Sequence, residues 1–165
     1  MLQPYIQEDR GATLSKDRKY RYKLWRRWDG GPMVMWIGLN PSTADENMDD
    51  PTIRRMIAFS KSWGFGGLTT CNLFGLISPY PEDLKRAADP LGDNDRHLLL
   101  AAQKAGRIVC CWGAFDVGDR AKDVCGWLLE GYELHCLGTN QDGSPKHPLY
   151  LKGSTALEPF MPQNL

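Results

Sequence analysis

The chain has 165 residues, of which 42% are hydrophobic, and its formal net charge at pH 7 is zero. This length and composition predict one domain, residues 1–165, with a single sizeable core. No apolar run approaches the roughly 20 residues of a membrane span, and the first residues lack the basic-then-apolar order of a secretion signal. We therefore expect a soluble cytoplasmic protein with no membrane partner. The zero net charge argues against nucleic-acid binding by bulk electrostatics.

Cysteine, histidine and glycine patterns exclude several kinds of site. The five cysteines are an odd number and lie in apolar segments, which favours buried reduced thiols. Neither they nor the three histidines have zinc-like spacing. The sequence contains no G-x-x-x-x-G-K loop, no G-x-G-x-x-G after its first apolar strand and no G-x-S-x-G elbow. We expect no metal and no cofactor.

The first predicted element is a β-hairpin over residues 16–39. Residues 16–27 carry seven Lys or Arg against one Asp, polar and apolar residues alternate within them, and Asp29-Gly-Gly separates them from the apolar run 33–39. Basic side chains on one face of such a hairpin are candidate nucleic-acid contacts, although they would equally well protect a sheet edge from pairing. The candidates, with one residue from the C-terminal part, are Arg21, Lys23, Arg26, Arg27 and Lys146.

Helices and strands then alternate along the chain. Asp50 suits an N-cap, Pro51 the first helical position and Gly64 the position after the helix end. Hydrophobic patterning predicts further strands at 68–74, 107–112 and 132–137, separated by helices at 82–88, 93–105 and 117–129. This order is typical of an α/β fold. We expect a three-layer α/β/α arrangement with a mainly parallel central sheet.

Polar residues follow several of the predicted strands. In a parallel sheet, ligands bind outside the carboxyl ends of the strands, so these segments are expected to form one site. Asn can read a base edge, an aromatic ring can stack on it, and His can stabilise a developing anion. Each residue also has a plainer interpretation as a turn or a solvated loop. The candidates are Gly38, Asn40, Pro41, Ser42, Asn72, Phe74, Gly113 and His147.

Two resemblances rest on these segments. "LNPSTADENMDDPTIRR", "WGFGGLTTCNLF" and "HPLYL" resemble a bacterial and phage family known only as a domain of unknown function. "GLNPS" is also similar to the first motif of the uracil-DNA glycosylase superfamily, and "HPLYL" resembles its H-P-S-P-L motif. This second, distant resemblance covers residues 34–151 and implies a glycosylase-like core.

The superfamily resemblance also implies roles. Asn40 would position the attacking water, Asn72 would read the flipped base, Phe74 would stack on it, and His147 would stabilise the leaving base. The leading hypothesis is a DNA glycosylase-like hydrolase that releases an unusual or modified base. The alternatives are an enzyme or binder for a free nucleobase or nucleotide on the same fold, and a non-catalytic nucleic-acid-binding module. Oligomeric state stays open.

Overall fold

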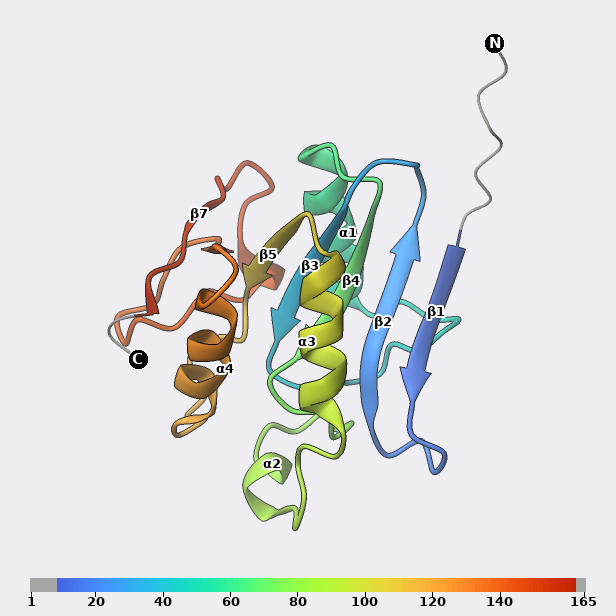
Figure 1. Cartoon of the computed structure of the whole chain (residues 1–165), viewed down its shortest axis with the longest axis vertical. Helices are drawn as coiled ribbons and strands as arrows, with labels where there is room; N and C mark the ends of the chain where they lie inside the picture. Colours follow the sequence, from blue (N-terminus) through green and yellow to red (C-terminus); the bar gives the residue numbers. More distant parts are fainter. Residues whose placement is uncertain (1–8, 163–165) are drawn as a thin grey trace.

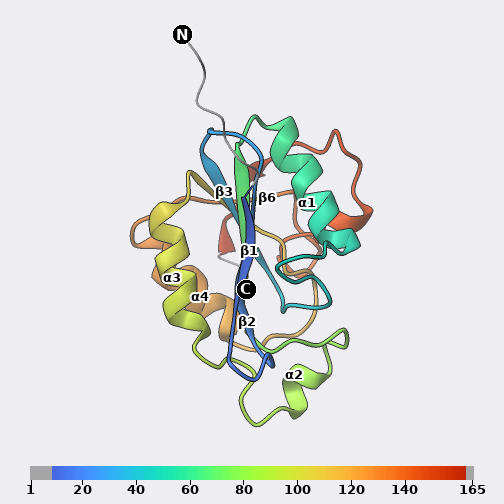
Figure 2. The same ribbon diagram turned by 90° about the vertical axis from the view of Figure 1, so that its right-hand side faces the viewer.

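The protein was analysed as a computed structural model that describes residues 9–162, and over this range it is an α/β fold (Figure 1). A seven-stranded sheet carries helices on both faces, as Figure 2 shows. The strands are β1 (Asp9–Leu14), β2 (Arg21–Arg27), β3 (Met33–Gly38), β4 (Gly67–Asn72), β5 (Arg107–Cys110), β6 (Leu134–Cys136) and β7 (Glu158–Pro159). The helices are α1 (Pro51–Ser62), α2 (Asp83–Arg86), α3 (Asn94–Lys104) and α4 (Arg120–Leu129), with a 3-10 turn at Pro148–Tyr150.

The sheet is mixed, with strand order β1-β2-β4-β3-β5-β6-β7. The four central strands β4, β3, β5 and β6 are mutually parallel, whereas β1, β2 and β7 join at the edges by antiparallel pairing. The expectation of a mainly parallel sheet therefore describes the centre only, because three of the six pairings are antiparallel. The two edge strands β1 and β7 were not predicted from the sequence.

The predicted hairpin over residues 16–39 is wrong. Strand β2 pairs with β1 on one side and with β4 on the other, so that β4 lies between β2 and β3. The segment after β2 crosses the start of β4 before the chain turns back, so β3 runs antiparallel to β2 without pairing with it. The amides of Trp28 and Asp29 donate to the carbonyl of Gly66, and a Cβ at Gly66 would collide with the backbone of Gly31. Glycine at these positions allows the two backbones to approach closely. The same Asp-Gly-Gly pattern is also typical of a hairpin turn, which is why the sequence predicted one.

Each face of the sheet has its own core. On one face α1 packs over β3 and β4, where Trp36 stacks on Trp63 with ring centroids 5.5 Å apart. On the other face α3 and α4 cover β3, β5 and β6. All five cysteines are buried as free thiols, four in this second core and Cys111 in the core under α1. Within residues 9–162 no helix is both long and apolar enough to cross a membrane.

The central helices and strands match the sequence prediction closely. Helix α1 begins at Pro51, and the Asp50 carboxylate caps it by accepting a hydrogen bond from the Ile53 amide at 2.8 Å. The prolines and glycines that marked this helix are local signals, so they are readable without tertiary information.

Candidate functional site

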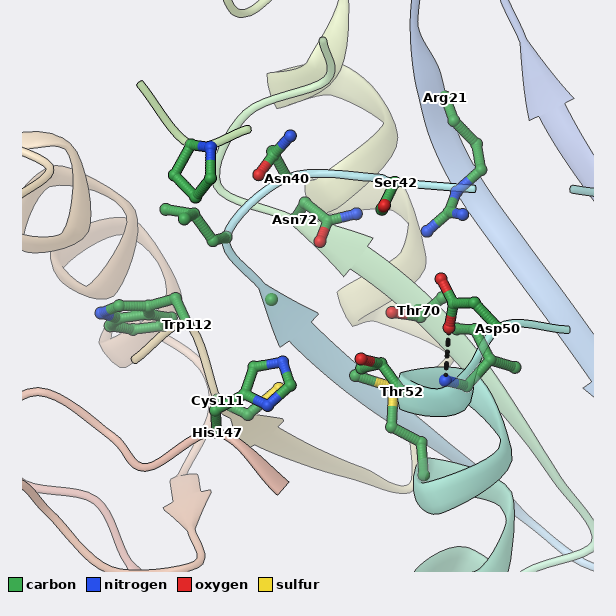
Figure 3. Close-up of a pocket in the computed structure, with 15 residues that line it drawn as sticks. Arg21, Asn40, Ser42, Asp50, Thr52, Thr70, Asn72, Cys111, Trp112 and His147 are labelled. Atoms are coloured by element: carbon green, nitrogen blue, oxygen red, sulfur yellow. Dashed lines mark hydrogen bonds between the residues drawn. The ribbon is translucent and has the colours of Figure 1, made fainter. Parts of the chain in front are cut away.

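A cavity of about 220 Å³ opens at the carboxyl ends of β3, β4 and β5, beside the N-terminus of α1 (Figure 3). The helix that follows β3 lies on one face of the sheet and the helix that follows β5 lies on the other, so this edge is a topological switch point. The lining residues are Arg21, Gly38, Leu39, Asn40, Ser42, Asp50, Thr52, Ile53, Met56, Thr70, Asn72, Pro81, Cys111, Trp112 and His147.

Asn72 is the most enclosed amide of the pocket. It ends β4, directly beside Gly38 at the end of β3, and is only 5% exposed. An ideal Cβ at Gly38 would lie 2.7 Å from Asn72 Oδ1, so the amide occupies space that any other residue at position 38 would fill. The Asn72 Nδ2 donor is buried and has no partner within residues 9–162. An unpaired buried donor is unfavourable unless a ligand accepts from it.

Three hydrogen bonds from its amide nitrogen fix the side chain of Asn40. Nδ2 donates to the carbonyls of Pro41, Leu76 and Ser78 at 3.0–3.2 Å. Three carbonyl acceptors fix which end of the side chain is the NH₂ group, because an amide oxygen cannot donate. Asn40 thus ties the strand end to the loop at 76–78, and its Oδ1 is left as an acceptor on the pocket wall.

His147 stands at the mouth of the pocket. Its Nδ1 accepts a hydrogen bond from the Leu149 amide at 3.2 Å, which assigns the ring proton of the neutral form to Nε2. Desolvation lowers the pKa of His147 below its ordinary value, partly offset by the negative charge of Asp50. The neutral ring with an Nε2–H donor is therefore the favoured form at pH 7.

Helix α1 fixes the segment that carries His147. Arg55 lies half-buried on α1 and donates through Nη2 to the carbonyl of Leu151 and through Nε to that of Pro148, the latter at 3.4 Å. The sequence motifs "DPTIRR" and "HPLYL", almost 100 residues apart, are thus joined directly. Arg55 is a positioning residue that sequence reasoning did not single out.

Arg21 enters the pocket because β2 contains a bulge. Thr13 pairs with Lys23 and Leu14 pairs with Arg21, so Tyr22 is an extra residue and Arg21 turns to the face of α1. The side chain is 3% exposed; its Nη1 donates to the carbonyl of Ala44 at 2.8 Å, whereas its Nε has no partner within residues 9–162. Burial lowers the pKa of Arg21 to about 10, and Asp50 opposes this shift, so the guanidinium is charged at pH 7.

The basic segment does not form one exposed face for nucleic acid. Arg21 and Arg26 are buried, and Arg26 Nε pairs with Asp49 at 2.8 Å. Lys23 and Arg27 line a different hollow beside α3, on the opposite face of the sheet. The single charged face predicted for this strand is therefore wrong, and nucleic-acid contact by these residues stays a prediction. Lys146 also lies elsewhere, with its side chain packed over Gly138.

The acidic residues that follow Asn40 pair with arginines of the basic segment 16–27. Glu46 accepts from Arg18 at 3.1 Å, and Asp49 pairs with Arg26. The Asp45 carboxylate accepts from the amides of residues 47 and 48 within its own loop. These pairs explain how opposite charge runs coexist in a chain of zero net charge.

Five of the eight predicted site residues line the cavity: Gly38, Asn40, Ser42, Asn72 and His147. Three do not. Pro41 is buried behind the wall, and Phe74 borders a separate hollow where the Arg120 guanidinium lies 5.9 Å from its ring. Gly113 lies close to His147, because an ideal Cβ at Gly113 would lie 3.9 Å from His147 Cβ. The aromatic residue on the pocket wall is Trp112.

Asp50, Thr52, Thr70 and Cys111 also line the pocket and were not predicted as site residues. Asp50 was predicted as a helix cap, in an acidic segment whose role stayed open, and the others carry no local signal. Burial raises the pKa of the Cys111 thiol far above its ordinary value, so Cys111 is a wall residue with no thiolate character. Residues 9–162 contain no group of three His, Cys, Asp or Glu side chains that would hold a metal ion.

Comparison with known proteins assigns the chain to a family. The family model described as "Protein of unknown function (DUF1643)" matches residues 21–149, which include β2, the pocket and His147. The chain belongs to this family. No curated protein and no solved structure gives a significant match.

Proposed function

We propose that the protein is a hydrolase that releases a nucleobase by cleaving its N-glycosidic bond, with DNA containing an unusual or modified base as substrate. The observation that carries the proposal is the convergence of Asn40, Asn72 and His147, from three distant segments, on one cavity. The volume of about 220 Å³ lies below the roughly 300–1,000 Å³ of pockets for drug-sized ligands, and therefore suits a single ring-sized group. The resemblance to the uracil-DNA glycosylase superfamily supports the same chemistry.

The proposed roles follow from donors and acceptors. Asn72 Nδ2, which is buried and has no partner in the described part of the chain, would donate to the edge of the base. His147 Nε2–H would stabilise negative charge on the departing base as a neutral hydrogen-bond donor. Asn40 Oδ1 would accept a hydrogen bond from the attacking water, since its Nδ2 is already engaged.

Asp50 would assist the same step. N-glycosidic cleavage develops positive charge on the sugar, and the Asp50 carboxylate is a negative group on the pocket wall. Its influence on the pKa values of both Arg21 and His147 indicates that its field reaches the two sides of the cavity. We assign it electrostatic stabilisation of the sugar cation.

The test uses oligonucleotides that contain uracil, mismatched thymine or modified pyrimidines, followed by alkaline cleavage at abasic sites. We expect base release by the wild type, and a loss of about 10²- to 10³-fold in His147→Ala and in Asn72→Ala, because each removes one donor. His97→Ala is the matched control, since His97 stacks on Tyr22 outside the pocket. Absence of abasic sites across the panel, or full activity in His147→Ala, would contradict the proposal.

A free nucleoside or nucleotide is the second candidate substrate. It is favoured by the burial of Arg21 and Arg26, which removes two cations from any surface that would follow a DNA backbone. Binding to a DNA backbone weakens steeply with salt because counterions are released. Base release from free nucleosides, together with DNA binding that is absent at low salt, would favour this candidate over DNA.

A further inference from the structure

The buried guanidinium of Arg21 is the feature of the pocket that the proposed chemistry leaves unused. It is 3% exposed, borders the cavity and has one protein partner for Nη1, the carbonyl of Ala44 at 2.8 Å. Its Nε has none within residues 9–162. A buried cation is unfavourable without a counter-charge and complete hydrogen bonding, so the site is incomplete as the protein stands alone.

Among residues 9–162, no carboxylate pairs directly with the Arg21 guanidinium. Within residues 9–162 no acidic side chain lies within 4.0 Å of Arg21, whereas Arg26 on the same strand has Asp49 at 2.8 Å. Asp50 also borders the cavity and attracts Arg21 over a longer distance, but its Oδ1 is occupied by the Ile53 amide. Within residues 9–162, Asp50 thus stabilises the charge of Arg21 from a distance, and no carboxylate accepts directly from the guanidinium.

Two further donors surround the same cavity. Asn72 Nδ2 is buried and unpaired, and α1, a helix of 12 residues, begins at Pro51 with Thr52 on the pocket wall. The N-terminus of a helix carries partial positive charge and favours anions. A guanidinium, an amide donor and a helix start together form a wall suited to anionic oxygen atoms.

We infer that the pocket binds a ligand bearing an anionic oxygen group, a carboxylate or a phosphate, which pairs with Arg21. The inference rests on the proposed function and narrows its substrate class. The group is either a carboxylate on the base itself or the phosphate of a nucleotide, and the guanidinium fork matches both. The bulge at Tyr22 directs the Arg21 guanidinium into the pocket.

The test is calorimetric titration of four probes: deoxyuridine, deoxyuridine 5′-monophosphate, 5-carboxy-deoxyuridine and inorganic phosphate. At least one anionic nucleoside should bind the wild type about 10- to 100-fold more tightly than deoxyuridine does, the range expected for a charge-assisted hydrogen bond. Arg21→Gln should abolish this difference. Arg27→Gln is the matched control on the same strand, because Arg27 lies outside the cavity and should leave it unchanged.

The pattern of binding identifies the source of the anion. A preference for the monophosphate assigns the partner of Arg21 to a nucleotide phosphate, and a preference for the carboxylated nucleoside assigns it to the base. Tight binding of inorganic phosphate alone shows an adventitious ion only and overturns the inference. It is also overturned if no anionic nucleoside binds better than deoxyuridine, or if folded Arg21→Gln retains the difference.

Binding and base release separate the two proposals. If Arg21-dependent binding is found while no substrate releases a base, the anion site stands and the hydrolase proposal fails. If base release depends on His147 but not on Arg21, and binding is indifferent to the anionic group, the hydrolase proposal stands and the anion site fails.

Discussion

Arg21 and Arg26 lie on the same strand, face α1 and are equally buried, yet their surroundings differ completely. Arg26 pairs with Asp49 and donates to the carbonyls of Trp25 at 2.9 Å and Asp45 at 2.6 Å. Arg21 donates through Nη1 to the carbonyl of Ala44, and its Nε has no partner within residues 9–162. Burial alone therefore does not show whether a charged side chain holds the fold or serves a ligand. The distinction lies in whether its hydrogen bonds are complete.

Replacing each arginine by methionine tests this comparison with the largest expected effect. Arg26→Met leaves Asp49 and several carbonyls without their donor, and should lower the free energy of unfolding by about 3 kcal/mol. Arg21→Met removes an unpaired buried charge together with one hydrogen bond, so the two effects offset each other and the change should stay below about 1 kcal/mol. Urea unfolding of the ligand-free proteins measures both. Equal destabilisation would show that Arg21 is a structural residue.

Gly38→Ala tests the pocket that Arg21 borders, because Gly38 lies against the Asn72 amide on the same cavity. The new Cβ would lie 2.7 Å from Asn72 Oδ1 and would push this amide out of position, with an expected destabilisation of about 1–3 kcal/mol. Ligand binding should weaken with it. Gly126→Ala in the middle of α4 is the control, because a Cβ there meets no atom within 4 Å. That substitution should stabilise the protein by roughly 0.5–1 kcal/mol. Unchanged binding in Gly38→Ala would remove Asn72 from the site.

The sequence predicted what depends on local signals. Asp50 and Pro51 marked the start of α1 correctly, and the rule that ligands bind at the carboxyl ends of parallel strands brought Asn40, Asn72 and His147 to one cavity. These predictions succeed because capping, helix periodicity and strand ends are encoded within a few neighbouring residues.

The errors in the predicted fold concern strand pairing and register. Nothing near the Asp29-Gly-Gly turn shows that β4 will separate β2 from β3, since the pairing of β2 with β4 joins residues 40 to 46 positions apart. The regular alternation of residues 20–25 also conceals the bulge at Tyr22. A one-residue shift moves side chains to the other face of a sheet, and for this reason Arg21 was taken as a surface residue when it belongs to the pocket.

Asp50 has both a structural and a pocket position, because it caps α1 and also borders the cavity. Asp50→Ala should lower the free energy of unfolding by about 1 kcal/mol through loss of the cap, whereas Asp50→Asn keeps a good cap and should change it little. Both variants remove a negative charge that raises the pKa of His147, so this pKa should fall further in both. Thermal unfolding and an NMR titration of His147 measure the two effects. An unchanged His147 pKa in both variants would show that the charge of Asp50 does not act on His147.

The smallest expected effect concerns the pH dependence of stability. Desolvation lowers the pKa of His147 in the folded state below the ordinary value near 6.5, so in the range just below 6.5 the unfolded chain binds more protons than the folded one. The free energy of unfolding should therefore rise as the pH increases through that range, and decline as it falls. His147→Gln should flatten this slope. His97 and His135 have lowered pKa values as well, but they are present in both proteins and cancel in the comparison. Denaturation series between pH 5 and 7.5 give the difference directly, and an identical slope in the two proteins would mean that the His147 ring is not desolvated at the pocket mouth.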